Sequence, residues 1–229
     1  MTSRVANRVI DATPDGQVIL CEVSDINLED VELQADEADL ASVEGMRGRR
    51  RSDRLIWRGM ARRLIDNRPL EVEYTVEGAP RINNYPYTHI SVSHCNKAIA
   101  LAVSQCLCGI DVECLDRNFR KVAPRYITPE EWLLKPTEDV GAANSTNGSG
   151  SGSASAEGED IEQMFLATVW CAKECLFKMY GRRGLDLCHD ICVESIDLEQ
   201  GVVAGHVKGH PQVMMKIVKT SDYIVVYHK

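Results

Sequence analysis

The chain has 229 residues, of which 44% are hydrophobic and 26% are charged, so it can bury a full core as one large domain or as two small domains packed together. Residues 1–16 lack the apolar stretch of a signal peptide, and no run of about 18 apolar residues occurs, so we expect neither secretion nor a membrane-spanning helix. The net charge of -8 argues against a general nucleic-acid-binding protein.

The first distinct segment, from Arg47 to Arg63, is strongly basic. It holds eight arginines and one acid, Asp53, and therefore carries a net charge of +7 within an acidic protein. Apolar residues at four-residue spacing predict a helix over residues 52–65. Four arginines fall on its other side, which indicates either a solvated face or a phosphate-binding surface; they are Arg51, Arg54, Arg58 and Arg62.

Residues 89–104 predict two strands joined by a turn near Cys95, and residues 107–113 predict a third strand. In this third strand Ile110 and Val112 point one way, while Asp111 and Glu113 point the other. Two adjacent carboxylates repel each other unless a cation lies between them, and Mg²⁺ prefers oxygen ligands. The strand is therefore a candidate magnesium site.

The rest of the chain predicts helices and strands in turn. A short helix follows Pro129, and residues 141–158 have the composition of a flexible Gly/Ser loop. A long helix is expected over residues 161–180, ended by Gly181. Four strands follow, at residues 191–198, 202–207, 213–218 and 223–227, and the whole pattern indicates an α+β fold made of two similar halves.

Trp170, Glu174 and Lys178 are four residues apart and so share one face of the long helix. Taken alone, Glu174 and Lys178 have the spacing of an ordinary surface ion pair. The helix adds a third carboxylate and an ammonium group to the candidate site, if its face meets the strand that carries Asp111.

The nine cysteines are odd in number and irregularly spaced, which favours free thiols in a reducing cytoplasm over disulfides. A structural zinc site is the less favoured alternative, because no Cys-x-x-Cys pair occurs. Its possible ligands would be Cys171, Cys175, Cys188, Cys192, His206 and His210.

Four motifs occur in the order typical of one enzyme family. Gly109-Ile110-Asp111-Val112-Glu113 resembles the Gly-Ile-Asp-Ile-Glu signature of the surfactin-synthetase-activating (Sfp-type) 4'-phosphopantetheinyl transferases, and Trp170 to Lys178 resembles their Trp-x-x-Lys-Glu-x-x-x-Lys signature. Ser91-Val92-Ser93-His94 and the arginine-rich helix resemble two further family features. The resemblance covers roughly residues 45–190.

The resemblance implies an α+β fold of two similar subdomains arranged as a pseudo-dimer. Their expected ranges are residues 1–108, with the basic helix and the Ser-His hairpin, and residues 109–229, with the carboxylate strand and the long helix, interrupted by the insertion at 141–158.

The resemblance also implies an activity: Mg²⁺-dependent transfer of 4'-phosphopantetheine from coenzyme A to a serine of an apo carrier protein. Such carriers serve fatty-acid, polyketide or nonribosomal peptide synthesis. The alternatives are a catalytically inactive relative that binds coenzyme A or a carrier protein, and another Mg²⁺-dependent phosphotransferase, which the missing glycine-rich phosphate loop disfavours.

The resemblance assigns roles to individual residues. Asp111, Glu113 and Glu174 would bind Mg²⁺, Lys178 would neutralise the diphosphate, and Glu174 would also accept the serine proton. Residues that would bind coenzyme A are Arg50, Arg51, Arg58, Ser93, His94 and Lys178.

Position 79 departs from the family pattern, and the role that the resemblance gives to His94 has an alternative. Ala79 stands where the family usually has lysine, and Arg81 is the residue expected to replace that contact. His94 alone would also fit a strand-end histidine bonded to the backbone.

Overall fold

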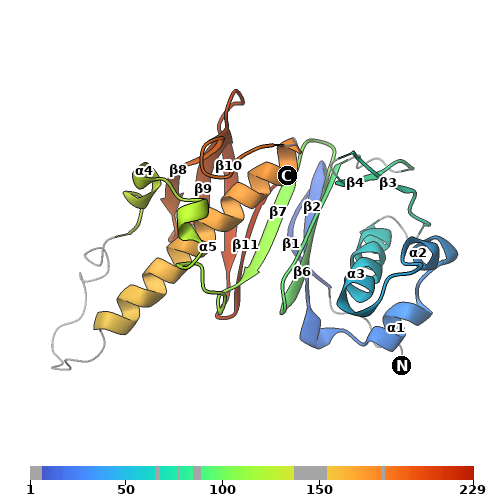
Figure 1. Cartoon of the computed structure of the whole chain (residues 1–229). Coiled ribbons are helices and arrows are strands. Elements are labelled where there is room, and N and C mark those ends of the chain that lie inside the picture. The colour runs from blue at the N-terminus through green and yellow to red at the C-terminus, as the bar shows by residue number, and fades with distance from the viewer. Residues whose placement is uncertain (1–6, 65–67, 77, 85–88, 137–153, 182–183) are drawn as a thin grey trace.

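The computed structural model describes residues 7–64, 68–76, 78–84, 89–136, 154–181 and 184–229. Two antiparallel sheets lie face to face, and helices cover the outer face of each sheet (Figure 1). The fold is therefore α+β, as the sequence predicts.

The first sheet is built by residues 7–104. Its strand order is β1 (Asn7–Thr13), β2 (Gly16–Glu22), β6 (Ala98–Ser104), β5 (His89–His94), β4 (Pro80–Ile82) and β3 (Val72–Tyr74). Helix α3 (Gly48–Leu64) packs on this sheet, and the short helices α1 (Leu28–Leu33) and α2 (Glu37–Ser42) pack against α3 (Figure 1).

The second sheet is built by residues 109–228. Its strand order is β7 (Gly109–Cys114), β11 (Tyr223–His228), β10 (Val213–Lys219), β9 (Val202–Val207) and β8 (Ile191–Asp197). The long helix α5 (Ala154–Tyr180) crosses its outer face, and α4 (Pro129–Trp132) lies near β8. The change of sheet between β6 and β7 supports the predicted division at residue 108, which stays a prediction.

Side-chain alternation gives the molecule three apolar layers. In β6, Ile99, Leu101 and Val103 face α3, whereas the alanines at 98, 100 and 102 face the second sheet. In β7, Ile110 and Val112 share one face, as predicted, and this face packs against the first sheet. Because the residues between the two sheets include several small side chains, β5 and β7 can approach closely enough for their polar side chains to bond.

The predicted hairpin, the short helix after Pro129 and the four C-terminal strands are confirmed, each within two residues. The long helix begins at Ala154, so the prediction of a loop was wrong for residues 154–158. Residues 141–153 lie outside the described part of the chain. No helix among the described residues is long and apolar enough to cross a membrane.

Candidate active site

The candidate site lies where β7 meets α5. Trp170 donates from Nε1 to Glu113 Oε1 at 2.9 Å, and Lys178 donates from Nζ to Asp111 Oδ1 at 2.8 Å. Trp170 and Lys178 are eight residues, or about 12 Å, apart along the helix, whereas Glu113 and Asp111 are only two residues, or about 6.6 Å, apart along the strand. The two long side chains therefore reach neighbouring carboxylates from either side of Glu174, which lies midway between them on the same helix face.

Gly109 permits this close approach. A Cβ atom at this position would lie 2.3 Å from the carbonyl oxygen of Cys175 and 2.7 Å from Cγ of Met179, both on α5. Such contacts are far inside normal packing distances, so a side chain at 109 would push β7 away from the helix. The glycine of the motif therefore sets the spacing of the site.

Asp111 is the central carboxylate. Its side chain is 6% exposed, and Oδ1 accepts hydrogen bonds from Ser93 Oγ at 2.7 Å and from Lys178. Lys178 also donates to the carbonyl oxygen of Ile110 at 2.9 Å. The other oxygen, Oδ2, is buried and makes no hydrogen bond with any described residue. A buried carboxylate oxygen without a donor is a suitable position for a cation ligand.

Glu113 is bonded to Trp170 and to Arg117, whose Nη1 donates to Glu113 Oε1. The Arg117 guanidinium also lies 4.4 Å above the Trp170 ring, in cation–π geometry. Burial, followed by the charge of Asp111, raises the pKa of Glu113 to about 7. Arg117 is a residue of the site that the sequence analysis missed, although its spacing of four residues from Glu113 was a possible signal.

Glu174 and Lys178 complete the cluster. Burial, followed by the charge of Asp111, raises the pKa of Glu174 above its ordinary value. Burial lowers the pKa of Lys178, but the charge and the hydrogen bond of Asp111 outweigh this effect and raise it. The mutual perturbation shows that these charges lie close together in a poorly solvated place.

The three carboxylates have the chemistry of a magnesium site, because they are hard oxygen donors whose mutual repulsion a cation would relieve. Their side chains are not arranged to bind an ion as they stand, because in the described part of the chain no three Asp, Glu, His or Cys side chains are grouped so that they could hold a metal ion. Oδ1 of Asp111 and Oε1 of Glu113 already accept hydrogen bonds from Lys178 and Arg117. A bound ion would have to compete with these two side chains.

A basic groove opens between α3 and β5. It has a volume of about 510 Å³, and its lining residues are Arg49, Arg50, Asp53, Arg54, Trp57, Tyr74, Pro80, Val92 and His94. His94 Nδ1 lies 3.3 Å from Asp53 Oδ2, and Arg49 Nε lies at the same distance from that oxygen. Arg50 is exposed. The groove therefore joins the predicted Arg50 and His94 to Arg54 of the predicted arginine face and to Arg49, which the sequence analysis had not selected.

A second groove of about 390 Å³ adjoins the first. Both grooves are lined by Pro80 and Val92, and the second also reaches Ala79, Phe177 and Lys178. Lys178 belongs to the carboxylate cluster as well, so a continuous surface leads from the arginines of α3 to the charged face of α5. Arg81 does not line either groove, and the structure gives no support to its replacing a lysine at position 79.

The structure does not bring Arg51 and Arg58 to the basic groove. Arg51 pairs with Glu32 of α1 at 3.1 Å. Arg58 is 3% exposed, pairs with the fully buried Asp39 of α2 at 2.6 Å, and donates to the carbonyl of Leu70. The prediction that Arg58 binds coenzyme A is corrected accordingly: its side chain holds α2 against α3. Acidic helices cover that face of α3, and the helical periodicity of α3 could not reveal them.

Ser93 and Lys173 also have internal partners. Ser93 is buried and holds Asp111, so it positions a carboxylate of the site and does not line either groove. Lys173, the lysine beside Glu174 in the motif, is fully buried and pairs with Glu131 of α4 at 2.8 Å. Lys173 therefore connects α5 to α4.

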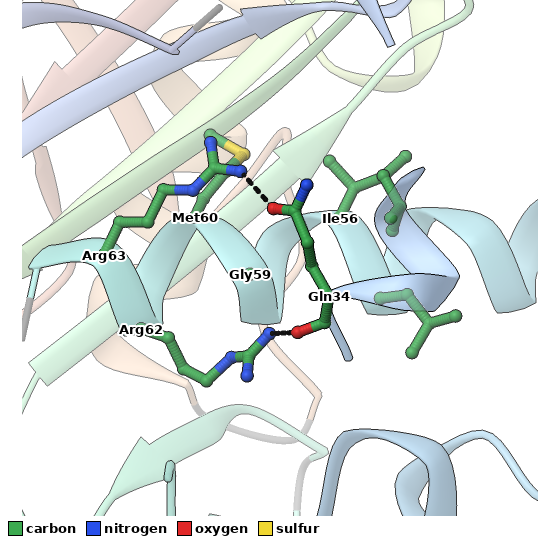
Figure 2. Close-up of a pocket in the computed structure, with 8 residues that line it drawn as sticks. Gln34, Ile56, Gly59, Met60, Arg62 and Arg63 are labelled. Carbon is green, nitrogen blue, oxygen red and sulfur yellow. Dashed lines mark hydrogen bonds between the residues drawn. The ribbon is translucent and has the colours of Figure 1, made fainter. Parts of the chain in front are cut away.

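A third cavity, of about 270 Å³, lies between α1 and α3 and is shown in Figure 2. Arg62 donates to the carbonyl of Gln34 at 2.7 Å, and Arg63 donates to the side-chain oxygen of Gln34 at 3.0 Å. This cavity contains none of the predicted site residues, and its arginines are bonded within the protein.

Comparison with known proteins gives a family match for the part of the chain that carries the carboxylates. Residues 107–219 match the family model of the 4'-phosphopantetheinyl transferase superfamily. No curated protein matches the chain. The two antiparallel sheets with few helices are consistent with the two similar subdomains of that superfamily. The match supports a transferase of the phosphopantetheinyl type, in a superfamily that generally uses coenzyme A, Mg²⁺ and a carrier protein. Residues 107–219 are thus a domain of the 4'-phosphopantetheinyl transferase superfamily.

Proposed function

We propose that the chain is an Sfp-type transferase that moves the 4'-phosphopantetheine group of coenzyme A to a serine of an apo carrier protein in the cytoplasm. The products are the holo carrier protein and adenosine 3',5'-bisphosphate. One observation carries the proposal: the two adjoining grooves connect an arginine cluster on α3 to Lys178, which is bonded to the Asp111 carboxylate at the junction of β7 and α5. Coenzyme A likewise carries a phosphate on its ribose and a diphosphate at the bond to be broken.

The basic groove would hold the 3'-phosphate through Arg49, Arg50 and His94. Guanidinium groups bind phosphate with paired hydrogen bonds, and Arg50 makes no hydrogen bond to a described residue that it would have to give up. Lys178, at the other end of the surface, would meet the diphosphate. The chain's own residues thereby fix both ends of the nucleotide, which favours in-line attack by orienting the reacting atoms.

Asp111, Glu113 and Glu174 would hold Mg²⁺. When bound, the ion supplies positive charge that stabilises the diphosphate as its bond breaks. Ser93 fixes Asp111 for this task through its 2.7 Å hydrogen bond. Lys178 adds a second positive charge beside the leaving phosphate.

Glu174 would act as the general base. The carrier serine oxygen attacks the β-phosphorus of coenzyme A, its proton passes to the Glu174 carboxylate, and the bond between the β-phosphorus and the bridging oxygen breaks. That oxygen leaves with adenosine 3',5'-bisphosphate. The raised pKa of Glu174 makes it a stronger base than an exposed glutamate.

Mass spectrometry of an apo carrier protein, incubated with the enzyme, Mg²⁺ and coenzyme A, tests the proposal. We expect a mass gain of one phosphopantetheine group, which disappears when Mg²⁺ is chelated. If coenzyme A binds but neither acyl nor peptidyl carrier proteins gain this mass, the chain is the inactive binding relative. Transfer of phosphate alone would indicate a different phosphotransferase.

A further inference from the structure

Each of the two β7 carboxylates is bonded to a cation supplied by the chain itself. The Lys178 ammonium lies 2.8 Å from Asp111 Oδ1, and the Arg117 guanidinium is bonded to Glu113 Oε1. Both cations are held by further contacts: Lys178 by the carbonyl of Ile110 at 2.9 Å, and Arg117 by the ring of Trp170 at 4.4 Å. The carboxylates are therefore neutralised in the absence of any bound ion.

Two effects oppose the binding of a divalent ion to this cluster. Lys178 and Arg117 already donate charge-assisted hydrogen bonds to one oxygen of each β7 carboxylate. The ion must also approach these two positive groups in a partly buried place, where charge repulsion is strong. Asp111 Oδ2 is buried and accepts no hydrogen bond from a described residue, but Oδ1 of the same carboxylate and Oε1 of Glu113 are both taken. A magnesium ion binds firmly through several oxygen ligands, so full use of the β7 carboxylates would require it to displace Lys178 or Arg117.

Lys178 also has access to a second partner. Its side chain is 26% exposed and lines the groove that adjoins the basic groove. A diphosphate in that groove would compete with Asp111 for the ammonium. Movement of Lys178 to the phosphate would release Oδ1 of Asp111 beside Oδ2, and so provide a carboxylate with both oxygens available.

We propose that Lys178 and Arg117 are internal counter-cations that keep the carboxylate site closed to free divalent ions, and that a diphosphate-bearing ligand opens it by drawing Lys178 away. The metal ion then binds with the nucleotide and not before it. This inference rests on the proposed function, because it takes coenzyme A as the diphosphate ligand, but it concerns the order of binding and not the transfer reaction.

Mn²⁺ binding to the intact protein, followed by the loss of the electron paramagnetic resonance signal of free Mn²⁺, tests this inference without turnover. We expect the parent protein to bind Mn²⁺ at least about tenfold more tightly with coenzyme A than with adenosine 3',5'-bisphosphate, which lacks the diphosphate. Because the diphosphate is itself a ligand, the decisive measurement is made without nucleotide. There, Lys178→Met should bind Mn²⁺ at least about tenfold more tightly than the parent, equivalent to about 1.4 kcal/mol.

Lys216→Met is the matched control, because Lys216 also pairs with a carboxylate, Asp11 at 2.7 Å, but lies on a different strand, β10. Its Mn²⁺ affinity should equal that of the parent. Arg117→Met is a second test if Lys178→Met does not fold; its side chain is 36% exposed, and its loss should also strengthen Mn²⁺ binding without nucleotide.

Two results would overturn the inference: nucleotide-free Mn²⁺ affinity that is unchanged or weaker in the folded variants, or parent affinity that is the same with and without coenzyme A. Carrier modification by the parent is measured separately. A parent that modifies the carrier while Lys178→Met shows no tighter binding disproves the gating and leaves the function standing. If Lys178→Met binds Mn²⁺ more tightly but the parent does not modify the carrier, the gating stands and the proposed function is disproved.

Discussion

Lys173 and Lys178 belong to one motif on one helix, and we expect their substitution to have different effects. Lys173 has no exposed surface, pairs with Glu131 at 2.8 Å and donates to the carbonyl of Leu187 at 2.8 Å. In Lys173→Met, the carboxylate of Glu131, which is 1% exposed, would lose its cation. The variant tests whether this lysine serves the fold.

Removing one partner of a buried ion pair costs about 3–5 kcal/mol, because the other charge stays buried without compensation. In a chain of this size, each kcal/mol lowers the melting temperature by about 2–4 °C. We therefore expect Lys173→Met to melt about 6–20 °C below the parent, as measured by circular dichroism. Lys135→Met is the control: Lys135 is 39% exposed and pairs with Glu162, so its loss should cost no more than about 1 kcal/mol.

A double variant separates lost charge pairing from poor packing. Glu131 accepts hydrogen bonds from the backbone N–H groups of Thr128 and Val193, and a glutamine oxygen can replace one of these acceptors. Lys173→Met with Glu131→Gln should therefore recover part of the lost melting temperature. If Lys173→Met melts within about 2 °C of Lys135→Met, the structural assignment of Lys173 is wrong.

Four further outcomes are expected. Because burial and Asp111 raise the pKa of Glu113 from 4.5 to about 7, the folded metal-free protein holds this proton more tightly than the unfolded chain. The free energy of unfolding should therefore fall as pH rises from about 4.5 through 7, and Glu113→Gln should weaken this dependence in urea titrations. In steady-state assays, Arg50→Ala should raise the apparent KM for coenzyme A about tenfold and leave the KM for dephospho-coenzyme A unchanged. Arg51 pairs with Glu32 of α1, so Arg51→Ala should change neither KM. Glu174→Gln should lower the transfer rate at least about 10²-fold at saturating Mg²⁺ without lowering the melting temperature, and near-parental transfer would contradict its role as base. Gly109→Ala should lower the free energy of unfolding, measured in urea, by about 1–3 kcal/mol, because the added Cβ has no space against α5.

Much of the second half of the fold could be predicted from the sequence. The alternation in β7 and the four-residue spacing in α5 are local patterns, and each fixes which side chains share a face. Asp111 and Glu113 share one face of β7, Glu174 and Lys178 share one face of α5, and the packing of α5 on β7 brings the two faces into contact. The turn residues and alternating strands after Gly181 predicted β8 to β11 for the same reason.

The first half was harder to predict because its decisive contacts join segments far apart in the sequence. Residues 28–42 form two short acidic helices, whose polar surfaces carry only a weak periodic signal. Asp39 and Glu32 cover one side of the α3 arginines, so Arg58 and Arg51 became structural residues. The +7 charge of the segment indicated an anion site but did not reveal which arginines remain available for it.

The position of Ser93 explains why both halves are needed for one site. Its hydroxyl crosses from the first sheet to Asp111 on the second, and the next residue, His94, faces the opposite way towards Asp53 of α3. Since successive side chains of a strand point to opposite faces, β5 bonds to the carboxylate cluster with one residue and lines the basic groove with the next. In the proposed site, this one strand therefore joins the basic groove to the carboxylate cluster. A change in the packing of the two sheets would alter both ends together.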